Sequence, residues 1–151
     1  MTFDDLRGKS QSELDDLFKR SPAGPIPDGD SRGEAIICPG TFWARLFARL
    51  VHTFAWQGKV FTRSPDGNDA TLQNKITAAG ARLIVARVYY TTSWLDGAKC
   101  IVLDYSKTSL FARRIRDEIR LVDEANRLYL GKVWWGKRRL IDFALMFPQP
   151  A

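Results

Sequence analysis

Residues 113–147 read RRIRDEIRLVDEANRLYLGKVWWGKRRLIDFALMF. Two turn signals, Ala125-Asn126 and Gly136-Lys137, divide this stretch into the segments Arg113 to Asp123, Arg127 to Trp135 and Arg138 to Phe147. Turns this short join strands that lie side by side and run in opposite directions. The stretch therefore predicts three consecutive strands of an antiparallel sheet.

The same alternation of strands and short turns begins at Trp56, with turn signals at Ser64 to Asn68, Ala79-Gly80 and Asp96-Gly97. With a first strand before Pro39-Gly40, eight strands are predicted: Ser31 to Ile37, Gly58 to Arg63, Thr71 to Thr77, Arg82 to Thr92, Lys99 to Tyr105 and the three above. A meander of about eight long strands normally closes on itself, because closure removes the exposed edges. The predicted fold is mainly β, an antiparallel meander closing into a lipocalin-like barrel. The alternative is an open curved sheet wrapped around a helix.

Two helices are predicted beside the sheet. Ser10-Gln11-Ser12-Glu13 matches a capping box, so a helix is expected from Gln11 to Arg20, followed by an extended Pro/Gly-rich connector from Ser21 to Asp30. An amphipathic helix is expected from Phe42 to Ala55, because its apolar residues recur at helical spacing. If that helix plugged the barrel from within, no lumen would remain.

The composition indicates one domain with a real core, since 45% of the 151 residues are apolar and 12% are aromatic. We predict that residues 1–30 form the N-terminal helix and connector and that 31–151 form the β-barrel domain. No stretch is typical of a membrane span or a signal peptide, so a cytoplasmic location is expected.

Charge is unevenly distributed along the chain. The net charge is +6, yet residues 1–30 hold four basic and seven acidic side chains, so the rest carries about +9. A basic body favours acidic ligands, anionic surfaces or nucleic acid by long-range attraction.

Metal and nucleotide chemistry are disfavoured by the residues present. The chain has a single histidine, His52, and two cysteines, Cys38 and Cys100, which are far apart in the sequence. They supply too few ligands for a zinc site, and both cysteines are expected to be buried thiols. Phosphate-binding glycine motifs are also missing. We therefore expect no metal and no cofactor.

The layout resembles the calycin-type, lipocalin-like small barrels of bacteria. The segment that carries this resemblance is Trp56-Gln57-Gly58-Lys59-Val60-Phe61, which opens the main run of hairpins, and the topology matches from about Ser31 to Phe147. The chain departs from classical lipocalins at Gly33-Glu34-Ala35-Ile36, where their Gly-x-Trp signature is absent. The resemblance implies the holding of an apolar or amphipathic small molecule in the barrel, and it transfers no catalytic residue.

Single polar residues inside apolar runs are the candidates for a binding site in the lumen. If the larger apolar sets face inward, alternation places Arg87, Tyr89, Tyr105 and Asp117 there, and we add Trp135 to this ligand-binding set. The opposite face of Arg113 to Asp123, with Arg116, Glu118 and Arg120, is predicted to face solvent.

An alternative without a functional role for these residues stays open. Asp117 would then lie at the barrel rim and pair with an arginine such as Arg113. Asp104 and Asp142 would face solvent, and Arg87 would be a charge at the rim.

Three functional hypotheses follow from the sequence. The first is binding of an apolar or amphipathic small molecule in the lumen. The second is a cofactor-free enzyme of isomerase, cyclase or decarboxylase type, in which Asp117 or Asp104 moves a proton and Tyr105 or Tyr89 donates a hydrogen bond beside Arg87. The third, which is disfavoured, is a basic surface from Arg113 to Arg120 for nucleic acid or an acidic partner.

Overall fold

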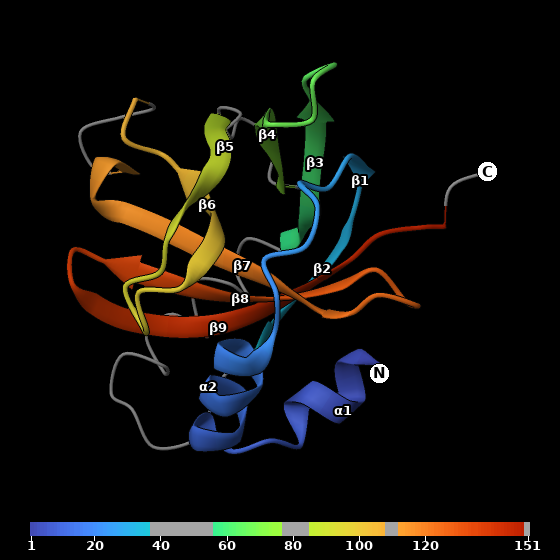
Figure 1. Cartoon of the computed structure of the whole chain (residues 1–151), viewed down its shortest axis with the longest axis vertical. Coiled ribbons are helices and arrows are strands. Elements are labelled where there is room, and N and C mark those ends of the chain that lie inside the picture. Colours follow the sequence, from blue (N-terminus) through green and yellow to red (C-terminus); the bar gives the residue numbers. More distant parts are fainter. Residues whose placement is uncertain (37–55, 77–84, 108–111, 150–151) are drawn as a thin grey trace.

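The computed structural model describes residues 1–36, 56–76, 85–107 and 112–149 (Figure 1). Two α-helices come first, α1 (Phe3–Arg7) and α2 (Gln11–Arg20), and a 3-10 turn, η1, spans Ala112–Arg114. The strands are β1 (Gly29–Asp30), β2 (Arg32–Ile36), β3 (Trp56–Arg63), β4 (Asp69–Ile76), β5 (Val85–Thr92), β6 (Lys99–Asp104), β7 (Ile115–Asp123), β8 (Leu128–Trp135) and β9 (Arg138–Met146). The helix predicted from Phe42 to Ala55 lies outside the described residues, as do the Ala79-Gly80 turn, Cys38 and His52.

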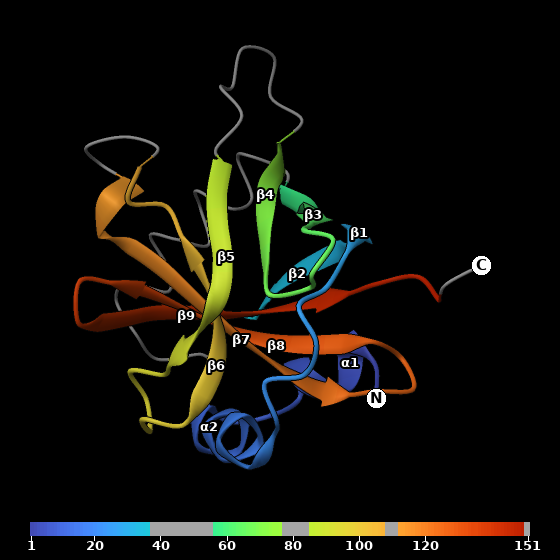
Figure 2. The same ribbon diagram turned by 45° about the horizontal axis from the view of Figure 1, so that its top comes forward.

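The predicted antiparallel meander is confirmed. Neighbouring strands pair in the order β1-β3-β4-β5-β6-β7-β8-β9-β2, and the sheet curls into a nearly closed barrel (Figures 1 and 2). The described ranges contain nine strands instead of the predicted eight, because the end of the connector adds the two-residue strand β1. The strand predicted from Arg113 begins two residues later, since Arg113 and Arg114 belong to η1.

The barrel closes at Ser31, which lies between β1 and β2. Strand β1 pairs with β3 and strand β2 pairs with β9, so one continuous segment joins the two ends of the meander. The Ser31 amide donates to the Lys59 carbonyl at 2.9 Å, and the Lys59 amide donates to Ser31 Oγ at 3.0 Å. Gly58 has φ +134°, and a Cβ placed on it would lie 2.2 Å from the Ser31 carbonyl oxygen. Closure therefore requires glycine at position 58.

The barrel wall has an apolar core on each side. The interior core includes Ile26, Phe61, Leu72, Ala86, Val88, Ile101, Leu103, Tyr105, Ile119, Leu121, Tyr129, Phe143, Leu145 and Phe147. The outer core, which joins α1 and α2 to the outside of the sheet, includes Leu6, Leu14, Leu17, Phe18, Ile36, Leu128, Leu130 and Ala144. In Figure 2 the two helices lie together beside β7 and β8.

Helix α2 forms where the sequence predicts it, from Gln11 to Arg20. The Ser10 hydroxyl accepts a hydrogen bond from the Glu13 amide, and the Glu13 carboxylate accepts one from the Ser10 amide, which is the reciprocal pattern of a capping box. Its apolar residues Leu14, Leu17 and Phe18 are buried against the sheet. No helix within the described ranges has both the length and the apolar character needed to cross a membrane.

The prediction that Glu118 and Arg120 face solvent is wrong. Their exposed fractions are 0% and 1%, because α2 and the β5–β6 turn cover this face of β7. The Arg120 guanidinium donates to the carbonyls of Phe18 and Lys19 at the end of α2. It also forms a bidentate pair with Asp96 in the turn, at 2.8 and 2.7 Å. One arginine thus fixes helix, turn and strand together.

Replacing Gly58 with alanine is expected to destabilise the fold by about 3 kcal/mol, since strain at positive φ adds to a clash with the Ser31 backbone. The matched control is Gly67→Ala. Gly67 also has positive φ, +73°, but nothing lies within 4 Å of an added Cβ, so a loss of about 1 kcal/mol is expected. Urea unfolding measures both. Equal losses would contradict the assignment of Gly58 to the closure point.

Replacing Arg120 with methionine is expected to cost about 3–5 kcal/mol, because Asp96 and two helix-end carbonyls lose their buried partner. Arg113→Met removes an exposed arginine from the start of the same segment and is expected to change the unfolding free energy by less than about 0.5 kcal/mol. Urea unfolding of the two variants tests this. A small loss for both would show that Arg120 does not hold α2 and the turn in place.

Candidate functional site

Three polar side chains meet inside the barrel: Lys59, Tyr105 and Asp117. Lys59 Nζ lies 2.6 Å from Tyr105 Oη and 3.1 Å from Asp117 Oδ2, and Tyr105 Oη donates to the same carboxylate oxygen at 3.0 Å. We call these residues the interior polar cluster. Lys59 and Asp117 are each 4% exposed and Tyr105 is 3% exposed. The three side chains are therefore joined pairwise by hydrogen bonds inside the barrel.

Strand alternation explains why these side chains converge. Lys59 lies two residues before Phe61 on β3, and Asp117 lies two residues before Ile119 on β7. Tyr105 directly follows β6, two residues after Leu103. Phe61, Ile119 and Leu103 all belong to the interior core, so the polar residues share their inward face.

Burial governs the electrostatics of Lys59. Loss of hydration lowers the pKa of its ammonium, and the neighbouring Asp117 carboxylate opposes this shift only in part. The rings of Tyr105 and Phe143 lie 5.3 and 5.4 Å from Nζ and supply weaker cation–π attraction. Burial thus favours the neutral, unprotonated amine more at Lys59 than at an exposed lysine.

Asp117 is incompletely satisfied. Its Oδ2 accepts from Lys59 and Tyr105, whereas Oδ1 is buried and has no hydrogen-bond partner in the described part of the chain. A buried acceptor without a donor costs on the order of 1–3 kcal/mol, and more when it is charged. Buried acceptors without a donor are rare in native proteins, so this oxygen calls for an explanation.

Gly131 gives the interior its shape beside this cluster. A Cβ on Gly131 would lie 2.2 Å from the Phe143 ring, so the ring occupies the space that a side chain on β8 would take. Phe143 in turn lies against Lys59 Nζ. The aromatic wall next to the lysine therefore depends on a glycine across the β8–β9 pair.

The structure brings together two of the residues predicted for the lumen, Tyr105 and Asp117. The partner of Asp117 is the buried Lys59, so the alternative that it pairs with Arg113 at the rim is wrong. Sequence reasoning missed Lys59. The sequence did contain a signal: Lys59 lies two residues before Phe61, so strand alternation places both side chains on the same face.

Arg87 and Tyr89 do not point into the lumen, and that expectation is wrong. On β5 the inward residues are Ala86 and Val88, which belong to the interior core, while Arg87 is exposed. The smaller side chains face inward at this strand, where Leu72 lies opposite Ala86. Tyr89 instead donates to Asp104 at 3.1 Å on the outer face. Asp104 is accordingly half-buried, not fully solvated.

Alternation places Trp135 on the same side of β8 as Val133, which packs against the interior core, and opposite Ile115. Its exposure is intermediate. Trp134 lies on the outer side, where its ring makes an edge contact with Trp94 at a centroid distance of 6.0 Å. Trp135 is thus near the end of the barrel at which β7 begins and β8 ends.

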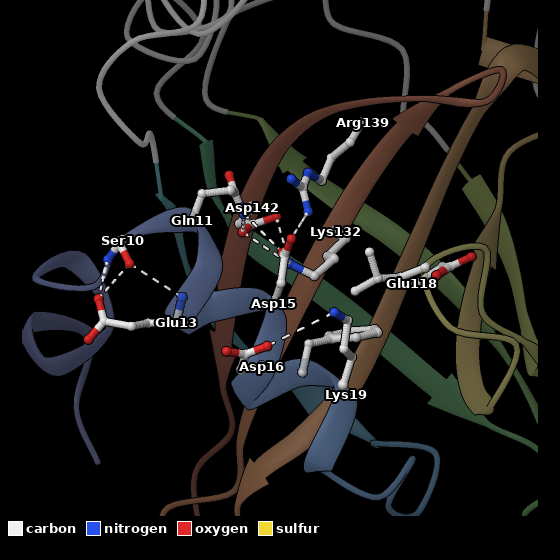
Figure 3. Close-up of polar contacts among 12 residues, drawn as sticks. Ser10, Gln11, Glu13, Asp15, Asp16, Lys19, Glu118, Lys132, Arg139 and Asp142 are labelled. Carbon is white, nitrogen blue, oxygen red and sulfur yellow. Dashed lines mark hydrogen bonds and ion pairs between the residues drawn. The ribbon is translucent and has the colours of Figure 1, made fainter.

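A second buried charge cluster lies on the outside of the barrel, beneath α2 (Figure 3). Lys132 Nζ lies 3.1 Å from Asp142 Oδ2 and 2.7 Å from Asp15 Oδ1, and Asp15 also pairs with Arg139. Asp142 is 1% exposed, so the prediction that it faces solvent is wrong, because α2 covers it and Gln11 donates to it. Burial alone would raise the pKa of Asp15, but hydrogen bonds from Arg139 and Lys132 outweigh it and lower that pKa. This outer cluster attaches the helix to the sheet.

Comparison with known proteins supports the fold. No protein-family model matches the chain, and no curated protein matches it. A crystal structure of a protein from Thermomonospora curvata is similar over 93% of this chain and 89% of that chain, with a TM-score of 0.61 and 19% sequence identity. At this identity the similarity shows the fold alone.

The pairing of Lys59 with Asp117 can be tested by a double-mutant cycle. Lys59→Met leaves a buried carboxylate without its cation and is expected to cost about 3–5 kcal/mol. Adding Asp117→Leu to that variant is expected to recover most of the loss, since two apolar side chains then face each other. Urea unfolding measures the free energy of unfolding of the wild type, the two single variants and the double variant. Losses that simply add would contradict a direct interaction.

Proposed function

We propose that the barrel binds an apolar or amphipathic small molecule in a lipocalin-like manner, with the polar group of the ligand at the interior polar cluster. The observation that carries this proposal is the buried Asp117 Oδ1, which lacks a hydrogen-bond partner among the described residues beside a buried lysine. Binding sites for small molecules combine mostly apolar walls with a few polar groups that fix orientation. The interior core and this cluster have that composition.

The contacts indicate which ligand chemistry fits. Oδ1 of Asp117 accepts a hydrogen bond, so the ligand carries an O–H or N–H donor. The apolar body of the ligand packs against side chains such as Phe143 and Ile119. Trp135, near the end of the barrel, is the proposed contact for the outer part of the ligand.

A second candidate is a cofactor-free enzyme of isomerase, cyclase or decarboxylase type. It is supported by the direct hydrogen bonds among Lys59, Tyr105 and Asp117, which give a proton a path between an amine, a phenol and a carboxylate. Lys59 takes the place of Arg87 in the catalytic set, since Arg87 faces outward.

The basic-surface hypothesis has less support. Arg120 is used inside the fold, and Arg116 donates to Glu118 and to the Thr92 carbonyl. Fewer arginines of this segment are therefore available to a nucleic acid or an acidic partner.

Native mass spectrometry of the purified protein, before and after denaturation, tests for a bound small molecule. We expect an adduct that is released on unfolding. The protein freed of it is expected to bind N-phenyl-1-naphthylamine, an apolar fluorescent probe with one N–H donor, at one site. Asp117→Asn is expected to weaken probe binding about five- to tenfold, because a charged acceptor is replaced by a neutral one.

The matched control is Asp104→Asn, which makes the same substitution on the outer face of β6. We expect unchanged probe affinity. An empty protein that takes up no probe, or equal weakening by both variants, would rule out binding at the interior polar cluster.

A further inference from the structure

We propose that Lys59 captures carbonyl compounds, condensing its side-chain amine with an aldehyde or ketone group of a molecule in the barrel to form an imine. This rests on the proposed function, because the carbonyl compound must first enter the interior. It adds a substrate class and a covalent step to that function.

The surroundings of Nζ suit a nucleophilic amine. Asp117 Oδ2 at 3.1 Å accepts the ammonium proton, and Tyr105 Oη at 2.6 Å fixes the position of the nitrogen. Only the neutral amine attacks a carbonyl carbon, and burial shifts Lys59 toward that form by lowering its pKa. The aromatic rings of Tyr105 and Phe143 provide an apolar environment in which an imine is protected from water.

Lys132 provides an internal comparison, because it is the other lysine that is buried in the described part of the chain. Its Nζ contacts two carboxylates, those of Asp15 and Asp142, within 3.2 Å. The contacts described for Lys59 Nζ include the Asp117 carboxylate and the Tyr105 phenol. Lys132 therefore belongs to the outer cluster that attaches α2 to the sheet, and it is the buried control for the test of Lys59.

The proposed reaction is balanced without an oxidant or a reductant. Asp117 takes a proton from the ammonium, the freed lone pair forms a C–N bond to the carbonyl carbon, and the C=O electron pair moves to oxygen. Tyr105 donates its proton to that oxygen and regains one from Asp117, with which it shares a hydrogen bond of 3.0 Å. The nitrogen then carries two protons, and loss of one of them together with the hydroxyl yields the protonated imine and one molecule of water.

The test uses the full chain with 2-naphthaldehyde and sodium cyanoborohydride, which reduces an imine to a stable secondary amine. Peptide mapping by mass spectrometry locates the product. We expect Lys59 to be modified at an initial rate at least about tenfold above the exposed lysines Lys99 and Lys137, with Lys132 unmodified. Modification of Lys59 no faster than that of the exposed lysines would overturn the proposal.

Two variants sharpen the result. Lys59→Arg keeps a cation beside Asp117 but cannot form an imine, so the interior adduct is expected to disappear. Tyr105→Phe removes the proton donor and is expected to slow adduct formation about tenfold. If Lys59→Arg is modified in the barrel as the wild type is, the nucleophile is not Lys59.

2-Naphthylmethanol, the alcohol that matches 2-naphthaldehyde, separates failure of this inference from failure of the proposed function. If 2-naphthylmethanol binds to the wild type and no Lys59 adduct forms, covalent capture is wrong while small-molecule binding stands. If neither the alcohol binds nor the aldehyde reacts inside the barrel, both are wrong.

Discussion

The hydrogen bonds that the Ser31 amide and hydroxyl form with the backbone of Lys59 hold the two ends of the sheet together, and the rest of the molecule depends on them. They let a single segment, β1 followed by β2, pair with β3 on one side and with β9 on the other. An open sheet of this length would expose two edges of unpaired backbone groups to other chains. Because the amide and carbonyl of Lys59 are used at the seam, its side chain is also fixed, and alternation points it inward toward Asp117. The closure of the barrel and the position of its buried lysine are thus two results of one interaction.

Buried charged groups lie on both sides of the barrel wall, and they differ in how completely they are hydrogen-bonded within the fold. On the outside, beneath α2, Lys132 is compensated by two carboxylates and Arg120 by a carboxylate and several carbonyls. These groups attach a helix and a turn to the sheet, and their hydrogen-bonding capacity is used within the fold. On the inside, Asp117 retains a buried oxygen without a partner in the described ranges. Since native proteins rarely leave such an atom unsatisfied, this difference separates a structural cluster from a candidate site.

Local signals in the sequence predicted the secondary structure well. The capping box at Ser10 and Glu13 defined α2, because both hydrogen bonds form within one helical turn. Short turns predicted the hairpins β3–β4, β5–β6, β7–β8 and β8–β9, because a tight turn leaves its flanking strands little choice but to pair. The face that each strand turns inward was predicted less well. On β5 the inward set proved to be Ala86 and Val88, and on β7 the face with Glu118 and Arg120 proved to be covered.

The sequence by itself determined the class of the fold, the order of its strands and the first long helix, since these follow from turn chemistry, capping and strand alternation over a few residues. It also identified Tyr105 and Asp117 as polar residues whose side chains point into the barrel. Only the tertiary structure decided that Lys59 completes their cluster and that α2 buries Glu118, Arg120 and Asp142. The physical reason is that burial of a charge depends on its partner. Lys59 and Asp117, or Arg120 and the end of α2, are far apart along the chain and meet only when the sheet closes and the helix packs on it.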